Sequence, residues 1–396
     1  MSAPDKPTRI ARIVTRLGVG GVERHVCSLS ANLDHDKFRS WLICGRAEKT
    51  ERECHEFAAE VGVEPIVIDQ LRRKLGLWDV TASLMLYQLL ARIQPHIVHT
   101  HQDKAGALGR SVARLRLRAQ GPRPHLVHTF HGHRFQGYFS SPVTRAFIAI
   151  ERVLARLTDL IITVTPTIRR QLIEQYRIAS ADKVRVVPLG FDFAWLNDIP
   201  RHRGWLRARL GARDSTVIFG TVGRLTRIKN TELLMRAFAR LLRETRMDAR
   251  LVVIGDGELL GALRSLADGL ALGERAIFVS WVLDRAKIFC DLDVTCLSSY
   301  NEGSPACLIE SLAAGVPVVA TRVGGVADVV SSALDGELVE SGNECAYTAA
   351  LARVANRRSR ISRERSVAVC ENYSTSRLVR DIENIYSEIL ENDRLR

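Results

Sequence analysis

Residues 10–33 read IARIVTRLGVGGVERHVCSLSANL. The apolar run at 10–17 predicts a buried strand, the glycines after it predict a turn, and 22–33 predicts a helix. The same order recurs along the first half of the chain, where helix-like stretches such as 78–93 and 142–157 separate further strands. These strands are SWLICG (40–45), EPIVID (64–69), HIVHTH (96–101), HLVHTF (125–130) and LIITVT (160–165). Strands that alternate with helices indicate parallel sheets built from right-handed βαβ units.

The alternation is interrupted once along the chain. The stretch PLGFDFAWLNDIPRHRGW at 188–205 shows no clean period, and a second alternating series starts with VIFGTVG at 217–223. We therefore predict an N-terminal Rossmann-like domain at 1–190, a linker at 191–214 and a second Rossmann-like domain at 215–373.

The last stretch, 374–396, predicts a long amphipathic helix that packs back on the N-terminal domain. The predicted fold class is thus α/β, with two Rossmann-like domains whose parallel sheets face each other across a cleft. Ligands of such domains bind at the carboxyl ends of the strands.

The composition is that of a soluble globular protein. The 396 residues are 46% hydrophobic and 26% charged, and this length suits two domains. No apolar run approaches the roughly 20 residues that span a bilayer, and the polar start lacks the apolar core of a signal peptide. We therefore expect a cytoplasmic protein. The eight cysteines show no zinc-like spacing, and we expect no metal site.

The formal net charge is +13, and arginines cluster in three stretches. An anionic membrane surface or a phosphate-bearing acceptor would explain this surplus, and so would an arginine-rich surface that faces only solvent. Nucleic acid is not expected as a partner, because zinc-finger, RRM and KH signatures are missing and aromatic residues are few. The clusters are Arg110, Arg114, Arg116 and Arg118; Arg201, Arg203, Arg207 and Arg209; and Arg357, Arg358, Arg360, Arg363 and Arg365.

The nonapeptide EGSPACLIE at 302–310 carries the strongest chemical signal. It follows a predicted strand, and Ser304 and Pro305 suit the N-cap and the first position of a helix. Glu302 then lies just ahead of the helix and Glu310 inside it, roughly 12 Å apart at about 1.5 Å per residue. This distance suits the two ends of a nucleotide sugar, with Glu302 at the sugar, Glu310 at the ribose and helix N–H groups at the diphosphate. The alternative is two surface glutamates beside an ordinary helix.

The segment GRLTRIKN at 223–230 is the second signal. It follows the strand at 217–222 and opens the next helix, so Arg224 and Lys229 can converge on the same diphosphate. Cations there would stabilise the negative charge that develops on a leaving nucleotide. Taken alone, the segment is equally well explained as a basic strand-to-helix turn.

These motifs, in this order, resemble the family-four retaining glycosyltransferases of GT-B fold. GRLTRIKN, EGSPACLIE and GVPVVATRVGG (315–325) resemble the donor domain of that family, and GVGGVERHV (18–26) resembles its first glycine loop. HTHQDKAGALGR (99–110) and HTFHGH (128–133) resemble a bacterial capsule and exopolysaccharide subgroup. The resemblance covers nearly the whole chain. It implies an N-terminal acceptor-binding domain and a C-terminal domain that binds a nucleotide sugar.

The resemblance also implies which residues bind the donor. Two cations would hold the phosphates, one glutamate the sugar and another glutamate the ribose, while backbone N–H groups follow the first glutamate. Arg224 and Lys229 would hold the phosphates, Glu302 the sugar and Glu310 the ribose. The backbone N–H groups are those of Gly303 and Ser304. The segment 278–284, which contains Val282, borders the base in relatives, but Ser280 replaces the usual glycine there and leaves contacts with the base less defined.

The N-terminal half contributes a histidine and two glycines to the implied site. His131 matches the family histidine near the anomeric carbon, and would act in catalysis together with Glu302, Arg224 and Lys229. Gly20 and Gly21 would let backbone amides approach a phosphate or the acceptor across the cleft. The crowding of five histidines leaves a structural or metal-binding role open for His131, although no carboxylate or cysteine is spaced to complete a metal site. The five are His99, His101, His128, His131 and His133.

Three further features have competing explanations. The loop at 18–23 is not a dinucleotide fingerprint, because Glu23 replaces the third glycine, and we expect this carboxylate to serve the helix N-terminus or an acceptor hydroxyl. Asp291 and Asp293 form a D-x-D string, but they precede a strand and so lie at the wrong end for an active-site metal. Lys104 could contact an acceptor diphosphate or could be a solvated lysine.

The sequence therefore predicts a metal-independent glycosyltransferase that moves a hexose or hexosamine from a nucleotide donor, which we expect to be UDP-linked, with retention. The predicted partners are the donor and an acceptor such as a polyprenyl-diphosphate-linked glycan at the inner membrane face. Natural-product and protein acceptors stay open, as do a UDP-sugar 2-epimerase and a catalytically silent sugar-nucleotide-binding protein.

Overall fold

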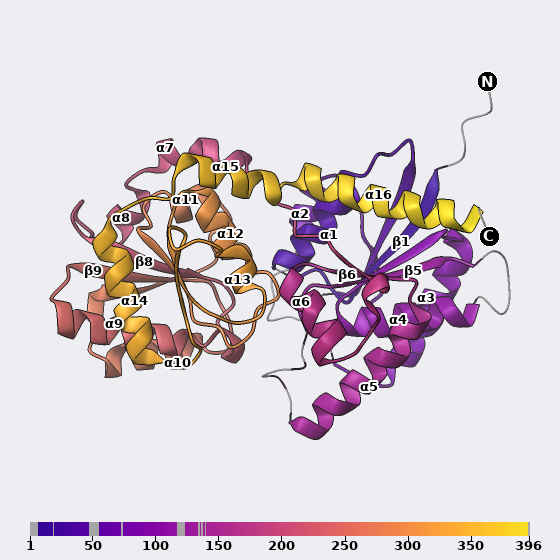
Figure 1. Ribbon diagram of the computed structural model, residues 1–396, viewed down its shortest axis with the longest axis horizontal. Helices are drawn as coiled ribbons and strands as arrows, with labels where there is room; N and C mark the ends of the chain where they lie inside the picture. Colours follow the sequence, from indigo (N-terminus) through magenta and orange to yellow (C-terminus); the bar gives the residue numbers. More distant parts are fainter. Residues whose placement is uncertain are drawn as a thin grey trace. The chain divides into compact units, whose positions relative to one another are not determined.

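The computed structural model describes residues 7–18, 20–46, 55–72, 74–116, 123–133, 135, 138 and 140–394. The chain divides into two compact units (Figure 1). The first unit comprises Met1–Phe191 and Tyr373–Arg396, and the second comprises Asp192–Asn372. None of the helices in the described ranges is long and apolar enough to cross a bilayer.

The described residues of the first unit form a seven-stranded parallel sheet in the order β3-β2-β1-β4-β5-β6-β7. The chain starts in the middle of this sheet, runs outward in one direction and then returns to build the other half. The strand order therefore reverses between β1 and β4, whose carboxyl ends are the usual ligand-binding place in such sheets. The strands are β1 (Thr8–Val14), β2 (Phe38–Cys44), β3 (Ile66–Val67), β4 (Ile97–His101), β5 (His125–Phe130), β6 (Leu160–Thr163) and β7 (Val184–Val186).

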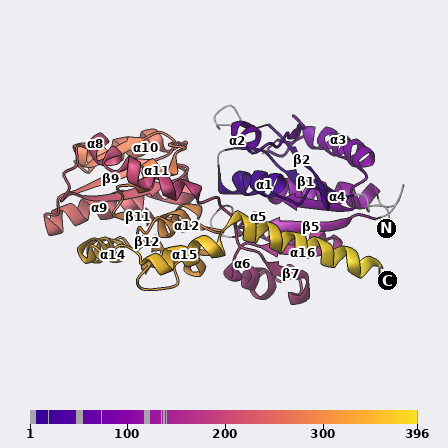
Figure 2. The same ribbon diagram turned by 90° about the horizontal axis from the view of Figure 1, so that it is seen from above.

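Helices cover both faces of this sheet because neighbouring strand residues point to opposite sides. Ile10 packs with α1 (Gly21–Ala31) and α16 (Thr375–Arg394), whereas the adjacent Ala11 packs with α3 (Trp78–Ile93) and α4 (Asp103–Arg116). Helix α16, yellow in Figures 1 and 2, lies along the first unit. The remaining helices of this unit are α2 (His55–Glu60), α5 (Ser141–Leu157) and α6 (Pro166–Arg170).

The second unit repeats the architecture with a parallel sheet of six strands in its described residues, in the order β10-β9-β8-β11-β12-β13. The strands are β8 (Val217–Val222), β9 (Ala249–Ile254), β10 (Ala276–Val279), β11 (Val294–Leu297), β12 (Val318–Thr321) and β13 (Gly336–Val339). The helices are α7 (Ile199–His202), α8 (Trp205–Arg209), α9 (Thr231–Thr245), α10 (Leu260–Gly269), α11 (Arg285–Phe289), α12 (Ala306–Ala313), α13 (Val326–Val329), α14 (Glu344–Arg357) and α15 (Arg363–Asn372). The expected α/β class with two parallel-sheet, Rossmann-like domains is confirmed.

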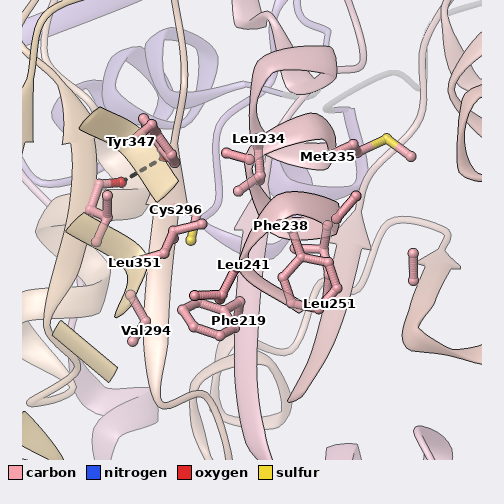
Figure 3. Close-up of a cluster of buried hydrophobic side chains, with 14 of the residues drawn as sticks. Phe219, Leu234, Met235, Phe238, Leu241, Leu251, Val294, Cys296, Tyr347 and Leu351 are labelled. Carbon is pink, nitrogen blue, oxygen red and sulfur yellow. Dashed lines mark hydrogen bonds between the residues drawn. The ribbon is translucent and has the colours of Figure 1, made fainter. Parts of the chain in front are cut away.

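A buried cluster between the second sheet and helices α9 and α14 holds this unit together (Figure 3). Phe219 and Phe238 pack edge to face, with ring centroids 5.8 Å apart. Tyr347 of α14 reaches across the cluster and donates its hydroxyl to the carbonyl of Val319 at 3.0 Å. The apolar body and satisfied hydroxyl of Tyr347 explain how a tyrosine can lie in this core.

Residues 192–214 of the predicted linker at 191–214 fold as part of the second unit, whereas Phe191 belongs to the first unit. They form a 3₁₀ turn at Ala194–Asp198 and helices α7 and α8. Leu206 and Leu210 are buried in a cluster with strand β8. Helices of four or five residues span little more than one turn, so they leave no periodic pattern in the sequence.

Candidate functional site

The basic motif GRLTRIKN and the acidic motif EGSPACLIE meet at the carboxyl edge of the second sheet, where β8 and β11 are neighbours. The hydroxyl of Ser298, just after β11, donates to the carbonyl of Asn230 at 2.8 Å. The backbone N–H of Tyr300 donates to the carbonyl of Ile228 at 2.8 Å. These bonds hold the turn after β8 against the loop after β11 and so bring GRLTRIKN to EGSPACLIE.

Lys229 and Glu302 form an ion pair at this junction. The Nζ of Lys229 lies 2.6 Å from Oε1 of Glu302, which also accepts a hydrogen bond from the Ser299 hydroxyl at 2.5 Å. Burial disfavours the charged amine, but the neighbouring Glu302 carboxylate outweighs it, and the pKa of Lys229 is raised above its usual range. Lys229 therefore stays positively charged at neutral pH.

Arg224 is exposed in the same turn, and its charge acts on Lys229. The turn is supported by the loop after β9, since the N–H of Leu225 donates to the carbonyl of Asp256 at 2.8 Å. Gly255, with φ of +141°, passes so close that a Cβ on it would lie 2.0 Å from the carbonyl oxygen of Gly223. The backbone around Arg224 is thus fixed by a glycine that cannot be replaced without displacing the turn.

Glu310 lies buried on α12 and forms a second ion pair with Arg285. Arg285 is the first residue of α11, and the Asp284 carboxylate caps this helix by accepting from the N–H of Ala286 at 3.0 Å. Arg285 is not among the residues predicted from the sequence to form the site. A signal was present, because a cation that opens a helix just beyond a strand lies at the same sheet edge as the two motifs.

The loop that joins the two glutamates differs from its expected form. Helix α12 begins at Ala306 with Pro305 as its N-cap, so Ser304 is not the N-cap, and its hydroxyl is buried without a hydrogen-bond partner among the described residues. Gly324, with φ of +49°, packs against the backbone of Glu302, where a Cβ would lie 1.8 Å from the Glu302 carbonyl. Gly324 of GVPVVATRVGG therefore positions Glu302.

In the first unit, histidines gather at the carboxyl ends of β4 and β5. Nδ1 of His101 is hydrogen-bonded to Nε2 of His131 at 3.0 Å. The His25 ring of α1 packs edge-on against His131, and His99 stacks on His101, with centroid distances of 5.0 and 4.3 Å. Burial lowers the pKa of His131 to about 3, so its imidazole is neutral at physiological pH. The other two histidines bond elsewhere, His128 to Thr100 and His133 to Gln171.

A buried polar network connects this histidine cluster to the C-terminal helix. The Tyr386 hydroxyl of α16 accepts from Arg12 at 3.0 Å and is bonded to Nδ1 of His99 at 2.6 Å. His99 is bonded on its other side to the hydroxyl of Thr129 at 2.7 Å. Among the described residues, no group of three His, Cys, Asp or Glu side chains is arranged to hold a metal ion.

The glycine loop brings a carboxylate close to the start of α1. Gly20 is the N-cap of α1 and Gly21 its first residue, while Val19 lies outside the described residues. A Cβ on Gly20 would lie 2.5 Å from Oε2 of Glu23, so a side chain at position 20 would require that carboxylate to move. Gln102, from the end of β4, donates to Oε1 of Glu23 at 3.2 Å. Glu23 thus lies in the first turn of α1, beside the end of strand β4, which carries His99 and His101.

Lys104 is shielded from solvent and bonded within the first unit. Its side chain is 9% exposed, its Nζ lies 2.5 Å from Asp79 of α3, and it donates to the carbonyl of Lys74. A contact between Lys104 and an acceptor diphosphate is therefore not supported. This lysine instead ties α4 to the start of α3.

The D-x-D string has a structural role in the second unit. Asp291 accepts from the N–H groups of Gly204 and Leu206, each at 2.9 Å, and so caps helix α8. Asp293 accepts from the N–H of Ile218 at 2.8 Å and pairs with Arg207. Both carboxylates are engaged in holding the segment before β8 onto the sheet.

The chain matches two family models and is similar to known proteins along nearly its whole length. Residues 19–195 match Glycosyltransferase Family 4, and residues 205–368 match Glycosyl transferases group 1. The chain is 27% identical over 360 residues to the UDP-Gal:alpha-D-GlcNAc-diphosphoundecaprenol alpha-1,3-galactosyltransferase of Escherichia coli, with 90% of each chain covered.

Solved structures show the same fold. HepE of Anabaena, in complex with UDP and glucose, superimposes with a TM-score of 0.77 at 17% identity, covering 96% of this chain and 100% of that chain. Sucrose-phosphate synthase of Thermosynechococcus elongatus superimposes with a TM-score of 0.78 at 20% identity, covering 97% and 100%. At these identities the likeness shows the fold alone, which is GT-B.

Proposed function

We propose that this chain, which belongs to the glycosyltransferases of GT-B fold, transfers a hexose or hexosamine from a UDP-sugar to a lipid-linked glycan with retention. The observation that carries the proposal is the pair of neighbouring contacts at one sheet edge, Lys229 with Glu302 and Arg285 with Glu310. An alternation of cations and carboxylates along one edge suits a ligand that alternates diphosphate with hydroxyl-rich rings.

The donor's diphosphate would be held by Lys229 and Arg224. An ammonium group has three N–H donors, so Lys229 can keep its bond to Glu302 and still donate to a phosphate oxygen. Glu302 would accept from sugar hydroxyls and Glu310 from the ribose, with backbone N–H groups of Gly303 and Ser304 near the phosphates. The segment around Val282 would lie near the base. The name of the E. coli relative and the UDP bound to HepE support uracil as that base.

In the proposed reaction, the bond between the anomeric carbon and the UDP oxygen breaks as the acceptor hydroxyl adds to the same face of the sugar. The departing phosphate takes the hydroxyl proton, and UDP leaves as the other product. Arg224 and Lys229 stabilise the charge that develops on that phosphate, which supports a metal-independent reaction. Neutral His131 would hydrogen-bond to the sugar through Nδ1, which is buried without a partner among the described residues.

The acceptor and the location of the reaction are part of the same proposal. The E. coli relative acts, by its name, on a diphosphoundecaprenol-linked sugar. We extend this acceptor class to the present chain, together with a role in cell-surface polysaccharide biosynthesis at the inner face of the cytoplasmic membrane. In this proposal, Gly20 and Gly21 of the first unit contribute to acceptor binding.

The test is a transfer assay with radiolabelled UDP-sugars and a polyprenyl-diphosphate-linked acceptor. Lys229→Ala and Glu302→Gln should each lower kcat by about 10²- to 10³-fold, the usual effect of removing one group that stabilises transition-state charge. The control is Arg236→Ala, an exposed residue of α9 paired with Glu232, which should leave kcat unchanged. Melting temperatures should stay within a few degrees of the wild type.

Near-normal turnover in Lys229→Ala would contradict the assigned site. Release of a 2-epimer from UDP-GlcNAc without acceptor would favour an epimerase, and nucleotide binding without any transfer would favour a silent binding protein. Transfer to a protein or natural product alone would overturn the acceptor class and leave the donor site standing.

A further inference from the structure

Helix α5 presents an apolar stripe to solvent. Val143, Ile150 and Val153 are 42%, 53% and 55% exposed, and the exposed residues Ala146 and Ala149 extend the same stripe. Positions separated by three, four and seven residues share one face of a helix, so these side chains form a continuous surface. Figure 1 shows α5, in magenta, as an outer helix of the first unit.

The orientation of α5 is fixed by its opposite face. Glu151 is buried and pairs with Arg110 of α4 at 2.9 Å, and Leu154 and Ala155 are buried beside it. Arg152 donates to the carbonyl of Tyr176 at 2.7 Å. Because these contacts already supply a core-facing side, the exposed stripe is a second apolar face of the same helix.

Arginines line one edge of the stripe. Arg145 and Arg156 are exposed and lie eleven residues apart, about three turns, which places them in one row along the helix. The acidic residue of α5, Glu151, faces inward and is neutralised by Arg110. The solvent-facing side of α5 therefore combines apolar side chains with positive charge.

Helix α9 is an ordinary surface helix of this molecule, and its exposed side differs from that of α5. Its exposed side chains include both signs of charge, and they pair along the helix, with Arg236 2.7 Å from Glu232 and Arg240 2.6 Å from Glu244. The apolar residues of α9 are instead buried against the sheet. An arginine-rich composition alone thus does not produce the surface of α5.

We propose that the exposed face of α5 docks on an anionic lipid bilayer, with its valines and isoleucine in the headgroup–acyl boundary and its arginines on lipid phosphates. Apolar side chains bordered by cations are the pattern of helices that lie in a membrane interface. A second copy of the chain fits less well, because an isologous contact would bring the arginine rows together. The inference deepens the membrane association proposed above and rests on it.

The experiment is flotation of the full-length protein with vesicles, without any sugar substrate. Wild-type protein should float with phosphatidylglycerol-containing vesicles and remain behind with phosphatidylcholine vesicles. The variants Ile150→Asp/Val153→Asp and Arg145→Glu/Arg156→Glu should each lower the bound fraction at least about tenfold, because the first removes apolar side chains from the headgroup–acyl boundary and the second reverses two cations that attract an anionic surface.

Matched controls carry the same changes on exposed side chains of the second unit. They are Leu334→Asp/Val367→Asp and Arg209→Glu/Arg243→Glu, which should bind vesicles like the wild type. All variants should keep the wild-type melting temperature and UDP-induced thermal shift, so that loss of vesicle binding is separable from misfolding and from failure of the donor site.

Four results would overturn the proposal. The first three are no flotation of the wild type with anionic vesicles, unchanged flotation of both α5 variants, and equal loss in the control variants. A wild-type dimer that the Ile150→Asp/Val153→Asp variant converts to monomers would also overturn it, because a second copy would then cover α5. If the α5 variants still floated, another surface of the protein would contact the membrane, and the proposed reaction would be unaffected.

Discussion

Lys229 and Glu302 contact each other although the resemblance assigns both to the donor. Both described contacts of the Glu302 side chain, from Lys229 and from Ser299, use Oε1. The second carboxylate oxygen is the acceptor that sugar hydroxyls would meet in the proposed complex. The ion pair therefore orients Glu302 before the donor arrives, and it keeps Lys229 charged in a partly buried place.

The buried histidines predict an acid-sensitive fold. An unfolded imidazole binds a proton below about pH 6.5, whereas burial keeps His131 neutral down to a pKa of about 3. The unfolded state thus takes up protons first, and stability falls as pH falls through this window. His131 alone should cost about 2 kcal/mol at pH 5 relative to pH 7. Burial also holds the pKa values of His25, His99 and His101 well below the usual range, which adds to the loss.

Urea unfolding at pH 7 and pH 5 measures this effect. In His131→Asn, the difference in unfolding free energy between the two pH values should shrink by about 2 kcal/mol. The control His35→Asn changes an exposed histidine and should leave the difference as in the wild type. An equal pH dependence in His131→Asn and the wild type would show that His131 does not stay neutral in the fold.

Single residues were predictable from sequence where a motif places them at a strand's carboxyl end. Arg224, Lys229, Glu302 and Glu310 all lie at one edge of the second sheet for this reason. Arg285 was missed because its role depends on its ion pair with Glu310, which lies 25 residues further along the chain. A contact of this kind follows from the lateral order of strands, which the sequence pattern does not reveal.

At the scale of elements, α16 is joined to the first unit by a polar network as well as by packing. Leu378 and Ile382 lie in the cluster with Ile10. Tyr386 then places one hydroxyl between Arg12 and His99. A permanently charged donor on one side makes Tyr386 donate to the histidine on the other, which fixes the tautomer of His99.

Tyr386→Phe should therefore destabilise the first unit. Removing the hydroxyl leaves a buried guanidinium and a buried ring nitrogen without their partner, at a cost of about 2–3 kcal/mol. The matched control is Tyr347→Phe in the second unit, which loses one hydrogen bond to a neutral carbonyl and should cost about 1 kcal/mol. Urea unfolding followed by circular dichroism compares the two. A smaller loss in Tyr386→Phe than in Tyr347→Phe would contradict the network.

The elements themselves were predictable to different degrees. Strands and long helices follow from their periodicity, and α16 from the amphipathic pattern at 375–393. The short helices α7 and α8 were taken for a linker. The start of α12 was misplaced because Ser304 and Pro305 are good terminal residues at more than one position, and the close approach of Gly324 to Glu302 decides between them.

At the scale of the whole molecule, the two units have separate hydrophobic cores. One core lies between β8, α9 and α14, and the sheet of the first unit has its own clusters on both faces. Such units usually unfold in separate or partly separate steps. The residues proposed to bind the nucleotide all belong to the second unit, so the nucleotide should stabilise one core and not the other.

Scanning calorimetry of the full chain with UDP tests this expectation. A ligand at about 100 times its Kd adds about 2.7 kcal/mol to the state that binds it, so the transition of the second unit should shift upward with UDP concentration. The transition of the first unit, which is the one that Tyr386→Phe lowers, should keep its melting temperature when UDP is added.

Glu310→Gln should reduce the shift in melting temperature caused by UDP, because Glu310 would hold the ribose. Glu340→Gln, on the exposed surface, should not reduce it. If UDP moved the transition marked by Tyr386→Phe, the nucleotide would bind the first unit. The carboxylates of the second sheet edge would then have to serve the acceptor instead.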